Sequence, residues 1–268
     1  MPVVELVVAG AAGRMGGRVI ALARDVANLR IVGAFERPGH PALGRDAGEV
    51  AGAGHLGVAI AADPTSLLEP GRVLVEFTAP EPTLEHVGLA ADRGAGAVVG
   101  TTGLKPPQVA EIRRLAGRVP ILLSPNMSVG VNLAFRVLAL MAKALGDDYD
   151  VEITEIHHRM KKDAPSGTAA KMAEVIADAL GRRIEDAGVY GRHGMVGERT
   201  AKEIGVHALR GGDVVGDHTV VFSTAGERLE LTHRAHSRDT FAHGALRAAR
   251  FVAAARPGLY SMHDVLGL

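Results

Sequence analysis

Cysteine and tryptophan are both absent from this 268-residue sequence, and aromatic residues make up only 3 % of it. A chain without cysteine has no disulfide bond, no thiol nucleophile and no cysteine-ligated metal. So few aromatic side chains argue against binding of nucleic acid by base stacking. The 30 basic and 30 acidic residues cancel, so no overall field draws the chain to nucleic acid or to an anionic membrane.

Long hydrophobic runs are missing as well. No uninterrupted apolar stretch approaches the ~20 residues that a membrane-spanning helix needs. The first ten residues contain Glu5 and lead straight into a glycine motif, which is typical of a buried strand and not of a signal peptide. We therefore expect a cytoplasmic protein that binds neither nucleic acid nor a membrane. Its 268 residues, 47 % of them hydrophobic, suit one large domain or two smaller ones.

A metal site is not expected either, although the chain has 12 histidines. The sequence contains no His-Glu-x-x-His motif, and His207, His218, His233 and His236 are spread over separate predicted strands. Since cysteine cannot complete a ligand set, we predict that the chain holds no zinc.

A glycine motif stands between the first strand and the first helix that the sequence predicts. Residues 3–9 form an apolar, β-branched run typical of a buried parallel strand, and apolar residues from Val19 onward mark a helix. Between them lies Gly10-Ala11-Ala12-Gly13-Arg14-Met15-Gly16. Gly10 would permit a tight turn, Gly13 would let the backbone approach a pyrophosphate, and Gly16 would let the helix pack on the strand. Glycine-rich turns also occur for structural reasons alone, but the order strand, glycine turn, helix predicts a dinucleotide-binding site.

Glu36 ends the next predicted strand, residues 29–35, and follows Gly16 by about twenty positions. An acidic residue at this place accepts hydrogen bonds from the adenosine ribose of a dinucleotide. Arg37 beside it would meet a 2′-phosphate. The pair therefore predicts a site that accepts both NADH and NADPH. An ordinary exposed Glu-Arg pair at a strand end is the alternative.

Strands and helices continue to alternate up to about residue 128. The predicted strands are 56–60, 73–78, 97–100 and 119–123, the predicted helices are 83–93 and 107–115, and residues 38–57 read as a long loop. Two strands end in the polar turns 101–103 and 124–128, and such turns line the cofactor crevice of parallel sheets. The alternation predicts a doubly wound, Rossmann-like α/β domain.

The most distinctive stretch of the chain is residues 152–169, EITEIHHRMKKDAPSGTA. It opens as a strand, in which Val151 and Ile153 share a face, and it closes as a helix with Ser166 as the N-cap. Two histidines, an arginine and two lysines lie between strand and helix. Together with the free N–H groups of a helix N-terminus, they concentrate donors and positive charge around one point.

That point suits an anion, and a dicarboxylate better than a monocarboxylate. His157 and His158 can exchange protons near neutral pH. The cations that flank Lys161 in the sequence would help it to release a proton. The alternative interpretation is a basic, solvated turn between a strand and a helix.

The remaining sequence predicts a second, smaller α+β domain. An apolar helix over 131–145 leads into it, and strands at 204–209, 217–222 and 227–233 give it an open mixed or antiparallel sheet. With only one long helix, this sheet would leave a face uncovered for oligomerisation. A final helix over 241–255 would pack back on the first domain. We therefore predict a dinucleotide-binding Rossmann domain of residues 1–128 and 239–268, and a substrate-binding and oligomerisation domain of residues 129–238.

The glycine turn, the Glu36-Arg37 pair and residues 152–169 together resemble the family of 4-hydroxy-tetrahydrodipicolinate reductases, also called dihydrodipicolinate reductases. The resemblance covers essentially the whole chain. Its most specific part is residues 152–169, which match the family signature Glu-hydrophobic-x-Glu-x-His-His-x-x-Lys-x-Asp-x-Pro-Ser-Gly-Thr-Ala. It implies a homotetramer that reduces 4-hydroxy-tetrahydrodipicolinate, by way of dihydrodipicolinate, to tetrahydrodipicolinate with NADH or NADPH, in lysine and diaminopimelate biosynthesis.

The resemblance also assigns roles to individual residues. His157 would be the proton donor and acceptor and Lys161 a proton donor, while His158, Gly167 and Thr168 would bind the small heterocyclic dicarboxylate substrate. The nicotinamide cofactor would be bound by Gly10, Ala11, Ala12, Gly13, Arg14, Met15, Glu36, Arg37, Gly100, Thr101, Thr102, Ser124, Pro125, Asn126 and Met127. Met127 departs from the aromatic residue that some family members have at this position.

Two other functions remain open from the sequence. One is another two-domain nicotinamide oxidoreductase that acts on a small amino or keto acid, against which the signature argues. The other is a non-catalytic protein that senses a nicotinamide dinucleotide. Such a sensor would be expected to lose His157 or Lys161 first, and both are present.

Overall fold

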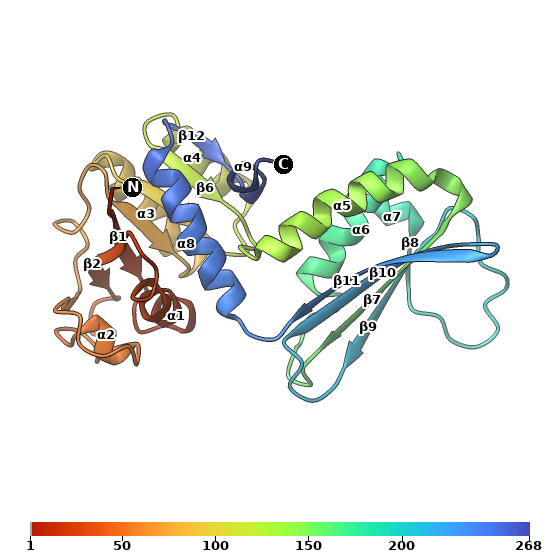
Figure 1. Cartoon of the computed structure of the whole chain (residues 1–268), viewed down its shortest axis with the longest axis horizontal. Coiled ribbons are helices and arrows are strands. Elements are labelled where there is room, and N and C mark those ends of the chain that lie inside the picture. The colour runs from red at the N-terminus through yellow and green to blue at the C-terminus, as the bar shows by residue number, and fades with distance from the viewer. Residues whose placement is uncertain (1) are drawn as a thin grey trace. The chain divides into compact units, whose positions relative to one another are not determined.

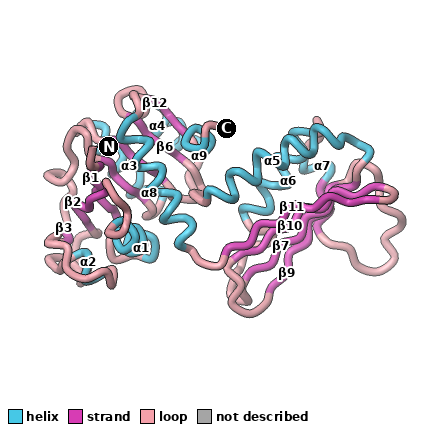
Figure 2. Tube along the Cα trace, in the orientation of Figure 1, coloured by secondary structure: helices cyan, strands magenta, loops and turns pink. Residues whose placement is uncertain are grey.

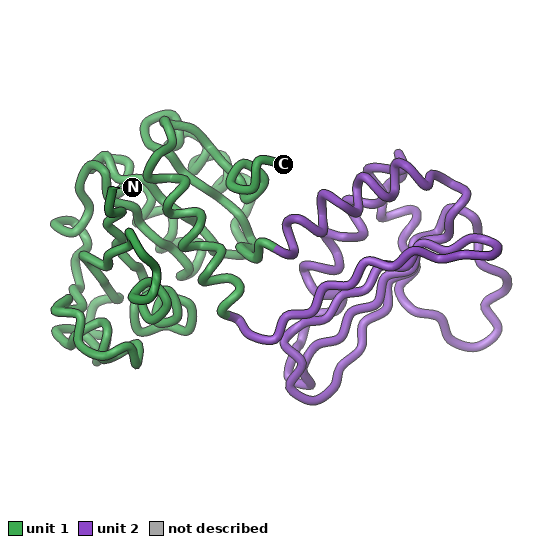
Figure 3. The backbone as a smooth tube through the Cα atoms, viewed as in Figure 1, with its two compact units in different colours: residues 1–129, 239–268 green, residues 130–238 purple. Residues whose placement is uncertain are grey.

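The computed structural model describes residues 2–268, which divide into two compact units (Figure 3). The first unit comprises the chain up to Val129 together with Asp239–Leu268, and the second unit is Gly130–Arg238. Each unit has hydrophobic core clusters of its own. The first unit is discontinuous in the sequence because the C-terminal helices return to it.

A seven-stranded sheet forms the centre of the first unit, with its strands in the order β12-β6-β5-β4-β1-β2-β3 (Figures 1 and 2). Its strand pairs are all parallel. Apart from β12, this is the usual strand order of a Rossmann sheet. The strands are β1 (Val4–Ala9), β2 (Leu29–Phe35), β3 (Ile60–Ala61), β4 (Val73–Glu76), β5 (Gly96–Val99), β6 (Pro120–Leu123) and β12 (Gly258–Tyr260).

Helices cover both faces of this sheet. Because side chains alternate along a strand, β1 sends Leu6 and Val8 to a core shared with α1 and α8, and Val7 and Ala9 to a core shared with α3 and α4. The helices of this unit are α1 (Arg14–Ala23), α2 (Ala47–Val50), α3 (Pro80–Asp92), α4 (Pro106–Leu115), α8 (Asp239–Ala254) and α9 (Met262–Leu266). The predicted doubly wound α/β fold is confirmed.

The segment after β2 is more ordered than the loop predicted for residues 38–57, since it contains α2. The Asp46 carboxylate caps this helix and also binds the chain that follows it. It accepts hydrogen bonds from the backbone N–H groups of Gly48, Glu49, Leu56 and Val58. One buried carboxylate thus organises a glycine-rich segment, which composition alone does not reveal. The predicted strand at 56–60 is shorter and begins only at Ile60.

A five-stranded mixed sheet, in the order β11-β10-β7-β9-β8, forms the second unit. Strand β10 is antiparallel to both β11 and β7, whereas β9 is parallel to both β7 and β8. The strands are β7 (Asp150–His157), β8 (Gly188–Tyr190), β9 (Ile204–Arg210), β10 (Gly216–Thr224) and β11 (Glu227–Ala235). The sheet predicted as mixed or antiparallel is therefore mixed.

Two long helices and one short helix lie along one face of this sheet, as Figure 1 shows. They are α5 (Val129–Leu145), α6 (Gly167–Ala179) and α7 (Ile184–Ala187), and a 3₁₀ turn (Gly146–Asp148) follows α5. The expectation of a single long helix is wrong, because α5 packs into the same core as α6 through Val131, Phe135 and Leu138. On the other face of the sheet, Thr154 and Leu209 are exposed.

Residues Val129–Asp148 meet the length and mean hydropathy of a membrane-spanning helix, at 1.5 on the hydropathy index. However, this stretch carries Arg136 and Lys143 and sends one face into the core of the second unit. Charged residues in the helix and a buried apolar face are typical of a core helix in a globular domain.

Candidate active site

The glycine motif forms the turn between β1 and α1. Gly10 has φ +61°, a conformation that favours glycine, and its carbonyl oxygen accepts a hydrogen bond from the N–H of Gly13 at 2.8 Å. A Cβ on Gly16 would lie 2.2 Å from the same oxygen, closer than two such atoms can approach. Glycine at position 16 therefore lets the first turn of α1 lie directly on the glycine turn.

The N-terminus of α1 opens onto this turn, because its N-cap residue is Gly13, which has no side chain to cap the helix. A Cβ at Gly13 would already lie 3.0 Å from the Gly10 carbonyl oxygen, so the turn excludes side chains. The N–H groups of a helix's first turn carry a partial positive charge and bind phosphate well. The turn therefore fits the pyrophosphate of a dinucleotide.

Glu36 reaches from the end of β2 to the glycine turn. Its Oε1 accepts a hydrogen bond from the N–H of Ala12 at 3.1 Å, and its Oε2 accepts one from the N–H of Arg37 at 3.2 Å. Since β1 and β2 are parallel neighbours, their carboxyl ends meet at one edge of the sheet. The carboxylate thus stands beside the turn, where a ribose hydroxyl can meet it, and Arg37 is exposed next to it.

Two further turns follow β5 and β6 at the same edge of the sheet. A Cβ on Gly100 would lie 2.1 Å from the ring of Phe77, so only glycine fits there. The Thr101 side chain is buried, and its hydroxyl lies 2.8 Å from that of Thr83 at the start of α3. Thr102, in contrast, is exposed.

The turn after β6 is held by its own polar atoms. The Ser124 hydroxyl donates to the carbonyl oxygen of Asn126 at 2.7 Å, and the Asn126 side chain accepts from the N–H of Ser128 at 2.9 Å. Met127 is only 1 % exposed and lies in the core beneath the sheet. The side chains of Ser124 and Met127 therefore serve the fold, which leaves the backbone of this turn for contact with a cofactor.

The residues predicted to bind the cofactor thus lie in the turns after β1, β2, β5 and β6, at the carboxyl edge of one parallel sheet. The order of the strands reverses between β1 and β4, where ligands of such sheets bind. The glycine turn, the uncapped N-terminus of α1 and the Glu36 carboxylate together fit a nicotinamide dinucleotide.

His157 is the last residue of β7, and only 9 % of its surface is exposed. Its Nδ1 lies 2.6 Å from Oε2 of Glu155, two residues earlier on the same face of the strand. Glu155 also accepts hydrogen bonds from Arg210 at 2.9 Å and from the N–H of Ser166 at 3.0 Å. Burial acts to raise the pKa of Glu155, but these hydrogen bonds outweigh it and hold the pKa below its usual value.

Lys161 lies in the turn after β7, and its ammonium pairs with a carboxylate. Both carboxylate oxygens of Asp163 lie 2.9 Å from Nζ, and the hydrogen bond from Lys161 lowers the pKa of Asp163. The expectation that the flanking cations would help Lys161 to release a proton stays a prediction. The Lys161 side chain can also donate hydrogen bonds to a bound anion.

The predicted substrate-binding residues lie in the same strand–turn–helix unit. The Ser166 hydroxyl caps α6 by accepting the N–H of Ala169 at 3.2 Å, as the sequence predicts. Gly167 and Thr168 form the first turn of α6, and the space where a Gly167 side chain would stand is open. His158 is anchored through its N–H, which donates to the carbonyl oxygen of Val214 at 2.7 Å.

The sequence did not reveal the partners that strands β9 to β11 supply to this turn. His218 on β10 lies opposite Glu155 in the strand register, its ring centroid is 5.2 Å from that of His157, and its Nε2 lies 2.9 Å from the Ser166 hydroxyl. Burial lowers the pKa of His218 to about 4, so the ring is neutral at pH 7. The ring centroid of His233 on β11 lies 6.3 Å from that of His218. Within residues 2–268, no group of three or more ligating side chains is placed to hold a metal ion.

Comparison with known proteins agrees over the whole chain. The family described as dihydrodipicolinate reductase, N-terminus, matches residues 4–127, and dihydrodipicolinate reductase, C-terminus, matches residues 130–266. The 4-hydroxy-tetrahydrodipicolinate reductase of Syntrophus aciditrophicus is 51 % identical over 263 residues, which cover 98 % of each chain. That of Citrifermentans bemidjiense is 53 % identical over 265 residues, which cover 99 % of each chain.

The fold is also similar to a solved structure of dipicolinate-bound dihydrodipicolinate reductase from Paenisporosarcina sp. TG-14. The TM-score is 0.76 and the sequence identity 22 %, with 98 % of both chains covered. The predicted resemblance to nicotinamide-dependent reductases is thereby confirmed. Because the two family matches together span nearly every residue, this chain belongs to the dihydrodipicolinate reductase family.

Proposed function

We propose that this protein uses NADH or NADPH to reduce 4-hydroxy-tetrahydrodipicolinate, by way of dihydrodipicolinate, to tetrahydrodipicolinate in lysine and diaminopimelate biosynthesis. Membership of the family supports the reaction class. The observation that carries the proposal is the turn between β7 and α6. There, the His157 ring is held by a buried carboxylate, and the same turn contains Lys161 and leads into the N-terminus of α6.

The first unit would hold the cofactor in the strand-end turns described above. When bound, the cofactor supplies a hydride to the substrate ring. The glycine turn and the N-terminus of α1 would bind its pyrophosphate, and the Glu36 carboxylate would accept the ribose hydroxyls. The exposed Arg37 guanidinium would pair with the 2′-phosphate of NADPH. This arrangement supports use of both cofactors.

The second unit would hold the substrate, a ring with two carboxylates. Dipicolinate, a ring with the same two groups, is bound in the solved reductase from Paenisporosarcina sp. TG-14. The N-terminus of α6 at Gly167 and Thr168 would take one carboxylate, because N–H groups and the helix dipole both favour an anion there. His158 and Lys161 would add hydrogen-bond donors to this end of the site.

Reduction adds one hydride and one proton to the unsaturated ring. His157 or Lys161 would supply the proton, since both hold one on a nitrogen near the substrate-binding turn. The Glu155 carboxylate stabilises positive charge on the His157 ring, to which it is hydrogen-bonded at 2.6 Å. A dinucleotide sensor without chemistry would need neither His157 nor Lys161, so their presence favours the reductase.

A coupled assay tests the proposal. The upstream synthase condenses aspartate semialdehyde with pyruvate in the presence of this protein, and the oxidation of NADH and of NADPH is followed separately by nicotinamide absorbance. We expect rapid oxidation that requires both the synthase and this protein, and the ratio of the two rates gives the cofactor preference. Protein that binds a dinucleotide but oxidises neither cofactor would contradict the reductase and favour the sensor.

We further propose that the protein is a cytoplasmic homotetramer, assembled through the helix-free face of the second-unit sheet. Leu209 on this face is 49 % exposed, its β7 neighbour Ile156 is half-buried, and so is Val221 further along the face on β10. Apolar side chains gathered on an open sheet favour association with another copy. The two domains proposed here correspond to the first and second units.

Light scattering tests the tetramer. Val221 pairs across the sheet with Glu152 and Glu230, so Val221→Asp adds a third negative charge to the centre of the face. We expect this variant to have a lower molar mass than the wild type. Ala225→Asp, at the exposed turn between β10 and β11, adds the same charge away from the face and should keep the wild-type mass. A monomeric wild type would contradict the proposal.

A further inference from the structure

Among residues 2–268, Glu155 is a buried carboxylate that contacts both ends of the turn between β7 and α6. It is 1 % exposed, and its two oxygens have different partners. Oε2 lies 2.6 Å from Nδ1 of His157 and 2.9 Å from Arg210, while Oε1 accepts the N–H of Ser166 at 3.0 Å. The guanidinium of Arg210 also donates to the carbonyl oxygen of Asp163 at 2.7 Å, within the turn itself.

The charge state of Glu155 decides which nitrogen of His157 holds a proton. An ionised carboxylate only accepts hydrogen bonds, so the 2.6 Å contact requires the proton on Nδ1 of His157. The second nitrogen, Nε2, is then the atom available to give or take a proton in the reaction. A Cβ at Gly216 on β10 would lie 2.8 Å from this Nε2, so the glycine keeps the space beside it clear.

We infer that Glu155 is a positioning residue for the reduction: it fixes the Nδ1–H form of His157 and holds that ring in register with the N-terminus of α6. The inference rests on the proposed function. The same carboxylate contacts the His157 ring, which would transfer the proton, and the N–H of Ser166. Ser166 directly precedes Gly167 and Thr168, which would bind the substrate. The buried Glu155 carboxylate therefore holds both the His157 ring and the start of α6.

The other charged or titratable groups around His157 do not replace this contact. His218 lies edge-on to the ring, with centroids 5.2 Å apart and the planes at 76°, and its Nε2 faces Ser166 and not His157. Arg210 reaches His157 only through Glu155. Lys161 has Asp163 as its partner. Glu155 is thus the acceptor that can select the form of the ring.

The variant Glu155→Gln removes this selection with little change in volume. An amide has one acceptor oxygen and one donor nitrogen, whereas the carboxylate accepts three donors on two oxygens. One orientation of the amide turns its NH₂ toward His157 and Arg210, and the other turns it toward the N–H of Ser166. We expect kcat to fall by about 10²-fold or more, while KM and the Kd for NADH change by less than about threefold.

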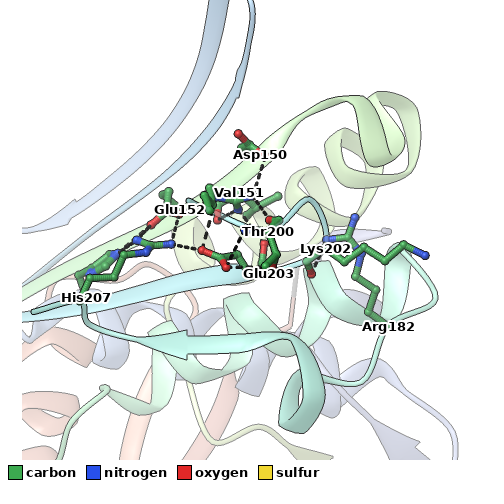
Figure 4. A network of polar contacts seen from close by, with 10 residues as sticks. Asp150, Val151, Glu152, Arg182, Thr200, Lys202, Glu203 and His207 are labelled. Carbon is green, nitrogen blue, oxygen red and sulfur yellow. Dashed lines mark hydrogen bonds and ion pairs between the residues drawn. The ribbon is translucent and has the colours of Figure 1, made fainter. Parts of the chain in front are cut away.

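The matched control is Glu203→Gln in the same unit. Figure 4 shows Glu203 with its polar cluster, and its side chain is nearly buried, like that of Glu155. Glu203 also accepts a hydrogen bond from an arginine, Arg192, and one from the backbone N–H of Thr200 at 3.1 Å. It does not contact His157. We expect its kcat and the pH profile of kcat to match the wild type, whereas the profile of Glu155→Gln should be displaced.

A spectroscopic measurement tests the inference without turnover and without a variant of Glu155. Long-range nitrogen–proton NMR of protein with ¹⁵N-labelled histidine distinguishes the two neutral forms of each ring, and His157→Gln identifies the His157 signals by their loss. At about pH 8.5, where an ordinary imidazole is neutral, we expect His157 to have its proton on Nδ1.

The outcomes separate this inference from the proposed function. A His157 ring with its proton on Nε2 in the wild type would overturn the inference, and so would a Glu155→Gln enzyme with wild-type kcat and pH profile. A wild type without reductase activity in the coupled assay contradicts the proposed function instead. Even then, the NMR measurement still decides which nitrogen of His157 holds the proton.

Discussion

At the scale of residues, His157 and Lys161 each have a carboxylate as their nearest charged partner, but the two pairs differ in burial. Glu155 is buried with His157, whereas the side chain of Asp163 beside Lys161 is 65 % exposed. An exposed ion pair contributes little free energy, so Lys161 can leave Asp163 to meet a substrate. A buried pair with several hydrogen bonds holds its geometry. His157 is therefore preorganised, and Lys161 is free to move.

Replacement of either residue should affect chemistry and not cofactor binding. We expect His157→Gln and Lys161→Ala each to lower kcat by about 10²- to 10⁴-fold, because each removes a proton-transferring group. The Kd for NADH, measured by fluorescence titration, should stay within about threefold of the wild type, since the predicted cofactor turns lie in the first unit. Turnover close to the wild type in either variant would remove that residue from the mechanism.

The buried His218 predicts a loss of stability in weak acid. Its pKa is lowered from 6.5 to about 4, so between these values the unfolded chain takes up a proton that the folded chain does not. The free energy of unfolding should therefore fall as the pH drops, with about 2 kcal/mol lost between pH 7 and pH 5. His233, whose pKa burial also lowers, acts in the same direction.

Denaturant unfolding of the wild type and of His218→Asn at about pH 7 and about pH 5 measures this effect. The variant lacks the titrating ring, so its stability should depend less on pH over this interval. Glu155 does not account for this pH dependence, because its pKa lies below 4.5. Its contribution to the free energy of unfolding is lost only in stronger acid. An equal pH dependence in both proteins would show that His218 is not the responsible group.

At the scale of elements, both candidate binding sites are helix N-termini that follow a strand of a sheet. Helix α1 begins at a glycine turn without a capping side chain, whereas α6 begins at Ser166, which caps it. Each of these turns places backbone N–H groups at the end of a strand, where an anion gains from the helix dipole. In the proposed function, each reactant would therefore have one anion-binding element.

The contact between α1 and its turn can be tested at Gly16. A Cβ there would lie 2.2 Å from the Gly10 carbonyl oxygen, so Gly16→Ala must push α1 away from the turn. We expect NADH affinity to fall at least about tenfold and the free energy of unfolding to fall by about 1–3 kcal/mol. Gly17→Ala is the control, because its Cβ would meet nothing closer than 3.7 Å, and it should bind NADH normally.

Calorimetric titration with NADH and denaturant unfolding of both variants supply the two measurements. Gly17→Ala should be as stable as the wild type or slightly more so, because alanine reduces the freedom of the unfolded chain. Equal NADH affinity in the two variants would mean that the close packing of α1 does not shape the cofactor site.

At the scale of the whole molecule, the two units have separate cores and separate candidate sites. Hydrogen exchange read by mass spectrometry can therefore assign each ligand to a unit. We expect NADH to slow exchange at residues 10–15 and 36–37, and dipicolinate to slow it at residues 157–168. Protection of the residues 157–168 by NADH alone, with none at the glycine turn, would reverse the proposed assignment of the domains.

Contiguous residues carry much of the candidate site, and these could be read from the sequence. The glycine turn, Glu36 at the end of β2 and residues 152–169 each have their roles encoded by neighbours along the chain. Turn glycines, an N-cap serine and strand alternation depend on local sterics and hydrogen bonds. The regular alternation of apolar strands with helices likewise predicted the doubly wound sheet.

Contacts between distant segments were not predictable in this way. Met127 turns its side chain into the core, α5 joins the core of the second unit, and Asp46 organises the segment that reads as a loop. Each depends on what lies across the fold from the residue and not on its neighbours in the chain.

The sequence by itself determined the family, the edge of the sheet at which the cofactor is predicted to bind, and the position of His157 and Lys161 in one turn, because local patterns encode them. Only the tertiary structure decided that Glu155, Arg210 and His218 surround that turn. They meet because β9 and β10 pair with β7 in a register that places Ala208 and His218 opposite Glu155, and Arg210 opposite His157. That register depends on the packing of a whole core, which no short stretch of sequence contains.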